Sequence, residues 1–175
     1  KSFNEDLSYN EFVAYQVVGR GLFDDSALAT DLARFLQLGT TLKDSDNPND
    51  KMFHSLDDMV SATGSAFLGL TIGCARCHDH KIDPITAEEY YRLTAVFLSR
   101  VKVEPRASDK AIPLEIREPH LLAGGSWKRP VKKVTPGFVE VLMRGDSRSE
   151  SWLAAKSAAT TLDPRYALAL WMTDV

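Results

Sequence analysis

Cysteine is scarce in this chain, which has only two among its 175 residues. Two thiols cannot build the disulfide framework that holds many small secreted domains together. No apolar run approaches the roughly 18 to 20 residues of a membrane-spanning helix; the longest, AFLGLTIGCA, is much shorter and contains two glycines. An excess of positive charge is also missing, and a formal net charge of −3 argues against a nucleic-acid-binding protein.

What is present indicates a globular protein. Hydrophobic residues make up 44% of the chain and charged residues 26%, enough apolar surface for one core, or for one core and a smaller appendage. The chain starts without Met and ends in the apolar helical pattern LALWMTDV, so we expect a fragment or a processed piece of a longer protein.

The hydrophobic spacing predicts a mostly helical fold. Ser8 with Glu11, and Thr86 with Glu89, have the spacing of capping boxes at two helix starts. The polar stretch 40–52 contains Pro48 and is predicted to be a surface loop. Prolines and glycines after Val101 favour short extended pieces and turns. The predicted helices cover residues 8–23, 24–39, 55–73, 84–100, 136–143, 149–159 and 163–173.

Both cysteines lie in one pentapeptide, Cys-Ala-Arg-Cys-His, at residues 74–78. This is the spacing of covalent haem attachment, in which Cys74 and Cys77 each form a thioether with a porphyrin vinyl group. His78 then follows as the proximal iron ligand. The pattern therefore predicts one covalently bound haem c, enclosed by a cytochrome c-like helical domain with irregular extended segments in its C-terminal half.

Other interpretations of these residues stay open. Cys-x-x-Cys also occurs in thiol–disulfide redox pairs, although these usually follow a strand in a βαβ unit, which is not visible here. Cys74, Cys77, His78 and His80 are alternatively the ligands of a structural zinc or another metal, although zinc sites normally draw a second ligand pair from further along the chain.

Residues around the motif supply further candidates. Arg76 and Lys81 could pair with the haem propionates. A distal iron ligand is less well marked: Met59, on an apolar helix stripe, comes first and His120 second, and Met59 is also well explained as core filler. His80 is expected to bond a propionate or a nearby carboxylate. An iron without a distal ligand would permit peroxidase-like chemistry.

The stretch FLGLTIGCARCHDHKIDPITAEEYYRL, residues 67–93, closely resembles the signature of the DUF1549 proteins, also called planctomycete cytochrome-like PSCyt2 proteins. The family pattern stands here as Gly69 to Ile85 followed by Glu89-Tyr90-Tyr91, with Glu in place of Asp. LDPRYALALWMTD resembles the opening of a DUF1553 domain. The stretch 99–119 is much shorter than the corresponding stretch of the family, so we expect a deletion or a gap there.

The resemblance implies a bacterial periplasmic or secreted protein with a c-type haem domain. It implies three regions: a haem-binding helical domain over residues 1–100, an irregular Pro/Gly-rich connection over 101–148, and the truncated start of a DUF1553-like region over 149–175. We expect a one-haem electron-transfer module that serves an unidentified redox partner protein, with no nucleic acid and no membrane span. The alternatives are a structural zinc or other metal-binding domain of a larger secreted enzyme, and a peroxidase-like haem enzyme with an open distal site.

Overall fold

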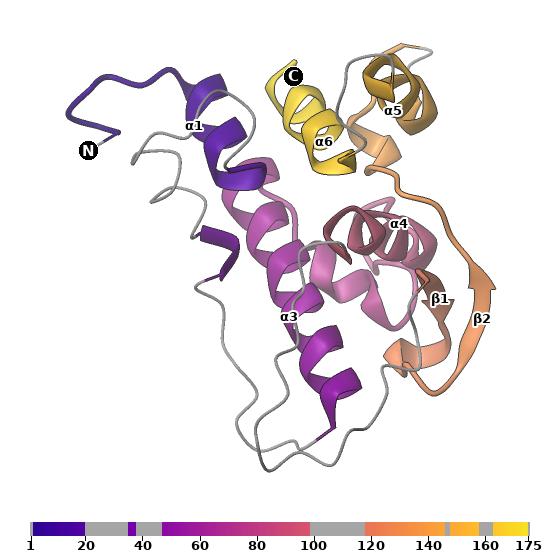
Figure 1. Cartoon of the computed structure of the whole chain (residues 1–175). Helices are drawn as coiled ribbons and strands as arrows, with labels where there is room; N and C mark the ends of the chain where they lie inside the picture. Colours follow the sequence, from indigo (N-terminus) through magenta and orange to yellow (C-terminus); the bar gives the residue numbers. More distant parts are fainter. Residues whose placement is uncertain are drawn as a thin grey trace.

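The computed structural model describes residues 2–19, 35–37, 47–98, 118–145, 148–157 and 163–174. Within them the chain is mostly helical, as predicted, with one small hairpin (Figure 1). None of the described helices is long and apolar enough to cross a membrane. Of the helix predicted over 24–39 only the 3₁₀ turn Phe35–Gln37 is described, and the expected gap at 99–119 lies almost wholly outside the described residues.

Helices α1 (Tyr9–Val17) and α4 (Ala87–Phe97) begin at the two predicted capping boxes, which are both confirmed. In α1 the Ser8 hydroxyl accepts from the Glu11 amide at 3.3 Å. In α4 the Thr86 hydroxyl accepts from the Glu89 amide at 3.2 Å, and the Glu89 carboxylate accepts from the Thr86 amide at 2.7 Å. Each box satisfies amides at a helix start that have no partner within the helix.

Helix α3 (Pro48–Thr63) starts earlier than predicted, inside the stretch assigned to a loop. Asn47 is its N-cap, with a side-chain oxygen that accepts from the Asn49 amide at 2.9 Å. Pro48 occupies the first helical position, where a missing N–H costs nothing and a fixed φ favours the helix. The proline therefore marks a helix start, and its interpretation as a loop residue was wrong.

The continuous helix predicted up to Gly73 is also wrong. After Thr63 the chain widens into one turn of π-helix, Gly64–Leu68, and ends at Gly69 in the left-handed region with φ +66°. Left-handed glycine is a common helix terminator. A separate 3₁₀ turn, Ile72–Arg76, then carries the start of the cysteine motif.

The C-terminal half contains the antiparallel hairpin of β1 (His120–Leu122) and β2 (Pro130–Lys133), joined through the turn Ala123–Gly125. His120 pairs with Lys133, and the register shifts between Leu121 and Leu122. Only the 3₁₀ turn Glu140–Leu142 forms where a helix over 136–143 was predicted. Val139 and Met143, on either side of this turn, have extended backbones. The amides of Gly137 and Phe138 are bonded by the Arg92 carbonyl at 3.1 Å and the Ser149 hydroxyl at 2.8 Å.

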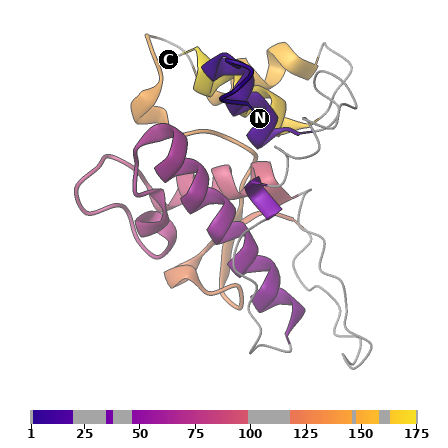
Figure 2. The same cartoon turned by 90° about the vertical axis from the view of Figure 1, so that its left-hand side faces the viewer.

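Helices α5 (Ser149–Ser157) and α6 (Pro164–Thr173) confirm the last two predicted helices. In both views α6 lies beside α1 at one end of the molecule, while α3 runs away from them toward the other end (Figures 1 and 2). One apolar core joins these elements. Its largest fully buried side chains are Phe97, Phe138, Leu56, Ile72, Ile85, Leu93, Leu168, Val13, Val17, Val60, Val96 and Val139.

Candidate cofactor-attachment site

The two cysteines lie on the outer side of the 3₁₀ turn Ile72–Arg76 and its C-cap, Cys77. Because a 3₁₀-helix has three residues per turn, residues three apart lie one above the other. Ile72 and Ala75 therefore share one side, where both are fully buried, and Cys74 and Cys77 share another, where both are exposed. Both thiols are free. The local sequence thus anchors the turn through its apolar pair and presents two thiols on the same side.

The buried side of this turn packs on the end of α3. A Cβ added to Gly64 would lie 2.8 Å from Ile72 Cδ1, and one added to Gly73 would lie 2.5 Å from Ser61 Oγ. Both approaches are closer than side chains tolerate, so these glycines let the turn sit directly on the helix.

His78 follows the second cysteine with an exposed imidazole. Its Nδ1 lies 2.7 Å from the backbone carbonyl oxygen of Asp79. A carbonyl only accepts hydrogen bonds, so Nδ1 carries the proton and the neutral ring keeps its lone pair on Nε2. Metal-ligating histidines typically donate their other ring N–H to a backbone carbonyl or a carboxylate in this way.

His80 has a different role. Its side chain is only 7% exposed, and Nδ1 accepts from the amides of Asp83 at 2.8 Å and Ile82 at 3.3 Å. Nε2 therefore carries the proton and donates to the Thr71 hydroxyl, 3.1 Å away. The Asp83 carboxylate lies 3.5 Å from Nδ1, but this nitrogen accepts from amides and has no proton to donate to it. The partners of His80 are therefore two backbone amides and the Thr71 hydroxyl, where a carboxylate or a propionate was expected.

These bonds leave the zinc alternative without support from the geometry. His80 has both ring nitrogens occupied within the protein, and in the part of the chain that the structure describes no group of three or more His, Cys, Asp or Glu residues is placed to hold a metal ion. Asp79 is also engaged: its carboxylate accepts from the Ala87 amide at 2.8 Å, at the start of α4.

Arg76, between the two cysteines, is held by the neighbouring helices. Its Nη1 lies 3.0 Å from Asp57 Oδ2 on α3, and the other oxygen of that carboxylate accepts from the Tyr90 hydroxyl at 2.6 Å. The Arg76 carbonyl accepts from the Tyr91 hydroxyl at 2.9 Å. The guanidinium predicted to bind a propionate is therefore already in an ion pair. Lys81, its companion in that prediction, is exposed.

Burial and charge shift the pKa values of this group. Partial burial is the largest single influence and would lower the pKa of Arg76, but the charge and hydrogen bond of Asp57, together with Tyr90 and Tyr91, raise the net pKa. Burial, followed by Asp57, raises the pKa of Tyr90. Burial also raises the pKa of Tyr91, to about 12. Both phenols therefore stay protonated at neutral pH and act as hydrogen-bond donors.

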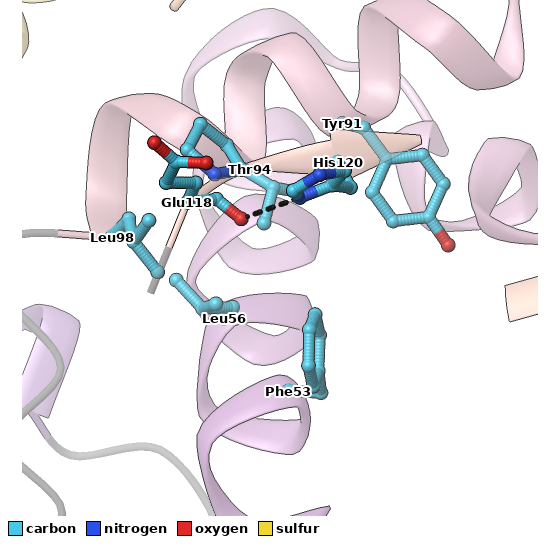
Figure 3. Close-up of a pocket in the computed structure, with 8 residues that line it drawn as sticks. Phe53, Leu56, Tyr91, Thr94, Leu98, Glu118 and His120 are labelled. Carbon is cyan, nitrogen blue, oxygen red and sulfur yellow. Dashed lines mark hydrogen bonds between the residues drawn. The ribbon is translucent and has the colours of Figure 1, made fainter. Parts of the chain in front are cut away.

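The two candidate distal ligands belong to α3 and β1. Met59 is 9% exposed and belongs to the core stripe of α3, as its core-filler interpretation predicts. His120 is half-buried at the start of β1, where Nδ1 bonds the Glu118 carbonyl at 2.8 Å (Figure 3). Neither is among the described hydrogen-bond partners of the motif.

His120 also lines a small pocket between α3, α4 and β1 (Figure 3). Its empty volume, about 270 Å³ including space open to solvent, is below the roughly 300–1,000 Å³ of typical ligand pockets. None of the motif residues lines it. The lining residues are Phe53, Leu56, Tyr91, Thr94, Leu98, Glu118, Pro119 and His120.

The hairpin covers one flank of the motif, which the sequence did not predict. Gly125 has φ +72°, and a Cβ there would lie 2.9 Å from Cys77 Sγ. Its carbonyl lies 3.5 Å from Arg76 Nη2. The pair Gly124-Gly125 was visible as a turn signal, but nothing in its spacing indicated which residue it would contact. Asp57, Tyr90 and Tyr91 were missed as site residues for the same reason.

Comparison with known proteins places the chain in a family. The family model described as PSCyt2, protein of unknown function (DUF1549), matches residues 1–102, more than half of the chain. The match includes α1, α3, the cysteine motif and α4, and stops before the hairpin. No similar curated protein and no similar solved structure is found. The chain therefore belongs to the PSCyt2 (DUF1549) family of proteins of unknown function.

Proposed function

We propose that this chain is a c-type haem domain that binds one haem covalently through Cys74, Cys77 and His78 and transfers single electrons. The observation that carries the proposal is the state of His78. Its imidazole is exposed and bonds a carbonyl through Nδ1, which leaves Nε2 as the ligating nitrogen of the neutral ring, directly after two exposed thiols on the same side of one turn. This is the donor set that covalent haem attachment uses.

The attachment chemistry needs no oxidant or reductant. Each thiol adds across one vinyl group: a sulfur–carbon bond forms, the S–H bond breaks, and the hydrogen goes to the other vinyl carbon. Haem supplies one-electron redox chemistry when bound. The chain's own contribution is to hold the two sulfurs, fix the tautomer of His78 and supply apolar contacts.

Ile82 is an exposed apolar side chain that follows the motif closely in the sequence. It lies in the loop after His78, and 85% of its surface is exposed although it is a large aliphatic residue. Burying such a side chain against an apolar face contributes about 1.5–3 kcal/mol. Covalent anchoring would give this residue a partner.

The wider proposal follows from the haem assignment. Such a domain passes electrons to or from a redox partner protein, and thioether-bound haem fits a periplasmic or secreted bacterial protein. A cytochrome c-like fold, Met59 or His120 as distal ligand, and a DUF1553-like continuation after residue 149 remain predictions. If no side chain occupies the distal position, the same haem would support peroxidase-like chemistry.

A visible spectrum tests the proposal. The chain is produced together with a bacterial haem-attachment machinery, purified and reduced. We expect a sharp α band and colour that stays with the polypeptide after acid–acetone extraction. Cys74→Ser with Cys77→Ser abolishes the bound colour, and His78→Ala shifts or removes the band, whereas His54→Ala on α3 is the matched control and leaves it unchanged. A colourless protein with stoichiometric zinc, or colour that survives the double cysteine substitution, contradicts the proposal.

Cyanide distinguishes the two haem functions. A closed electron carrier keeps its oxidised spectrum at low cyanide concentration, because a side chain holds the sixth position. A rapid spectral change with cyanide, together with turnover of peroxide, would show an open distal site. Repeating the titration with Met59→Ala and His120→Ala identifies the ligand as the residue whose loss opens the site.

A further inference from the structure

Arg76 lies between the two cysteines. Residues outside the turn bond both its side chain and its main-chain carbonyl. Asp57 of α3 pairs with the guanidinium at 3.0 Å, and Tyr91 of α4 donates to the main-chain carbonyl at 2.9 Å. Tyr90, beside Tyr91 on α4, donates to Asp57 at 2.6 Å and so connects the two supports. We call Asp57, Tyr90 and Tyr91 the clamp.

The clamp is rigid because its phenols are buried. Tyr90 is 2% exposed and Tyr91 3%, and their rings meet edge to face with centroids 4.9 Å apart. A buried hydroxyl that loses its partner pays the full cost of its desolvation, so these bonds resist opening. Asp57 and Arg76 are partly exposed, at 26% and 34% of their side chains, and their ion pair alone would hold the turn weakly.

We propose that the clamp positions the Cys74–Cys77 turn before any cofactor arrives, so that the two thiols stand at a set separation. The use of this turn for haem attachment rests on the proposed function. The ordering of the turn rests on the hydrogen bonds alone. A turn that is already ordered loses less conformational entropy when two bonds form to one rigid group. Arg76 is thus a positioning residue, and its guanidinium serves the turn and not a propionate.

A reagent that bridges two thiols tests the geometry without haem. Phenylarsine oxide reacts with a dithiol to form two arsenic–sulfur bonds, and its oxygen leaves as water with the two thiol hydrogens. Its affinity for the reduced, haem-free chain of 175 residues reports the separation of the sulfurs. Iodoacetamide, which alkylates one thiol at a time, reports only exposure.

Tyr91→Phe and Asp57→Asn are the informative variants. Tyr91→Phe keeps the packed ring and removes only the donor to Arg76, and Asp57→Asn keeps the shape and removes the charge. We expect phenylarsine oxide to bind either variant about threefold to tenfold more weakly, as the loss of one net hydrogen bond predicts. The rate of iodoacetamide reaction should not change. The matched controls are Tyr9→Phe, exposed at the start of α1, and Asp58→Asn, the neighbour of Asp57 on α3.

Unchanged arsenical affinity in both variants overturns the inference. A drop that comes with faster iodoacetamide reaction also overturns it, because it would show general loosening of the fold around the cysteines. The haem yield of the same variants separates the two proposals. If the unsubstituted chain takes up no haem while arsenical affinity depends on Asp57 and Tyr91, the haem proposal fails and the clamp stands.

Discussion

His78 and His80 show how hydrogen bonds alone assign different roles to two residues of one kind. His78 is exposed and offers a free ring nitrogen, because its other nitrogen donates to a carbonyl. His80 uses both ring nitrogens inside the protein and fastens the loop that follows the motif. The sequence distinguished them only through the position of His78 directly after Cys77.

We expect His80→Ala to lower the free energy of unfolding by about 1–3 kcal/mol, because a hydrogen bond is worth roughly 0.5–1.5 kcal/mol and two amides lose their acceptor. Urea unfolding followed by tryptophan fluorescence measures it. His120→Ala is the control: it loses one described hydrogen bond and should cost about 1 kcal/mol. Equal midpoints for His80→Ala and the unsubstituted chain would show that the loop is held without this histidine.

At the scale of elements, local signals predicted helix starts better than helix ends. The capping boxes of α1 and α4 lie within four consecutive residues each, and both form as predicted. The start of α3 was missed because a proline suits a loop as well as a first helical turn. The helix expected over 136–143 is reduced to the 3₁₀ turn Glu140–Leu142, because the backbone is extended at Val139 before the turn and at Met143 after it.

The contact of the hairpin with the cysteine motif is testable at Gly125. Gly125→Ala meets two costs, a left-handed backbone and a Cβ 2.9 Å from Cys77 Sγ. Gly69→Ala is the matched control, since Gly69 has φ +66° and nothing within 4 Å of its added Cβ. We expect about 1–2 kcal/mol of destabilisation for the control from backbone strain.

Gly125→Ala should lose only slightly more stability than the control, because the exposed Cys77 side chain can rotate away from the added methyl, and it should change the alkylation rate of Cys77. Denaturant unfolding gives the first quantity, and mass spectrometry of the iodoacetamide-treated protein gives the second. If Gly125→Ala and Gly69→Ala lose the same stability and Cys77 is alkylated as fast as in the unsubstituted chain, the hairpin does not contact Cys77 as described.

At the scale of the whole molecule, the last described helix is part of the same core as the first. Arg165 of α6 is buried and donates through Nη1 to the carbonyls of Val17 at 3.2 Å and Val18 at 3.0 Å, at the end of α1. Asp163 accepts from the same guanidinium at Nε. These carbonyls have no partner within their helix, and a cation at a helix C-terminus is favourable. The family match ends at residue 102, but the packing continues to α6.

We expect Arg165→Ala to cost about 1.5–3 kcal/mol, the usual worth of hydrogen bonds to a charged group, since the carbonyls of Val17 and Val18 lose their donor. The stability of Arg165→Lys should lie between those of Arg165→Ala and the unsubstituted chain, because one ammonium nitrogen replaces the separate Nε and Nη1 atoms that bond Asp163 and the two carbonyls. Thermal unfolding followed by circular dichroism compares these variants with Arg144→Ala, an exposed control expected within about 0.5 kcal/mol of the unsubstituted chain. If Arg165→Ala loses no more unfolding free energy than the Arg144→Ala control, the bonds of Arg165 to the end of α1 do not stabilise the protein.

The sequence by itself determined the features that depend on short spacing: two thiols three residues apart with a histidine after them, two capping boxes, and a mostly helical chain. Periodicity and cap chemistry act within one or two turns, so they can be read without knowing the fold. Only the tertiary structure decided that Asp57 and Tyr91 hold Arg76, that Gly125 lies against Cys77, and that Arg165 closes α1. Those contacts join residues far apart in the chain, and they follow from how helices and hairpin share one core, which no local spacing specifies.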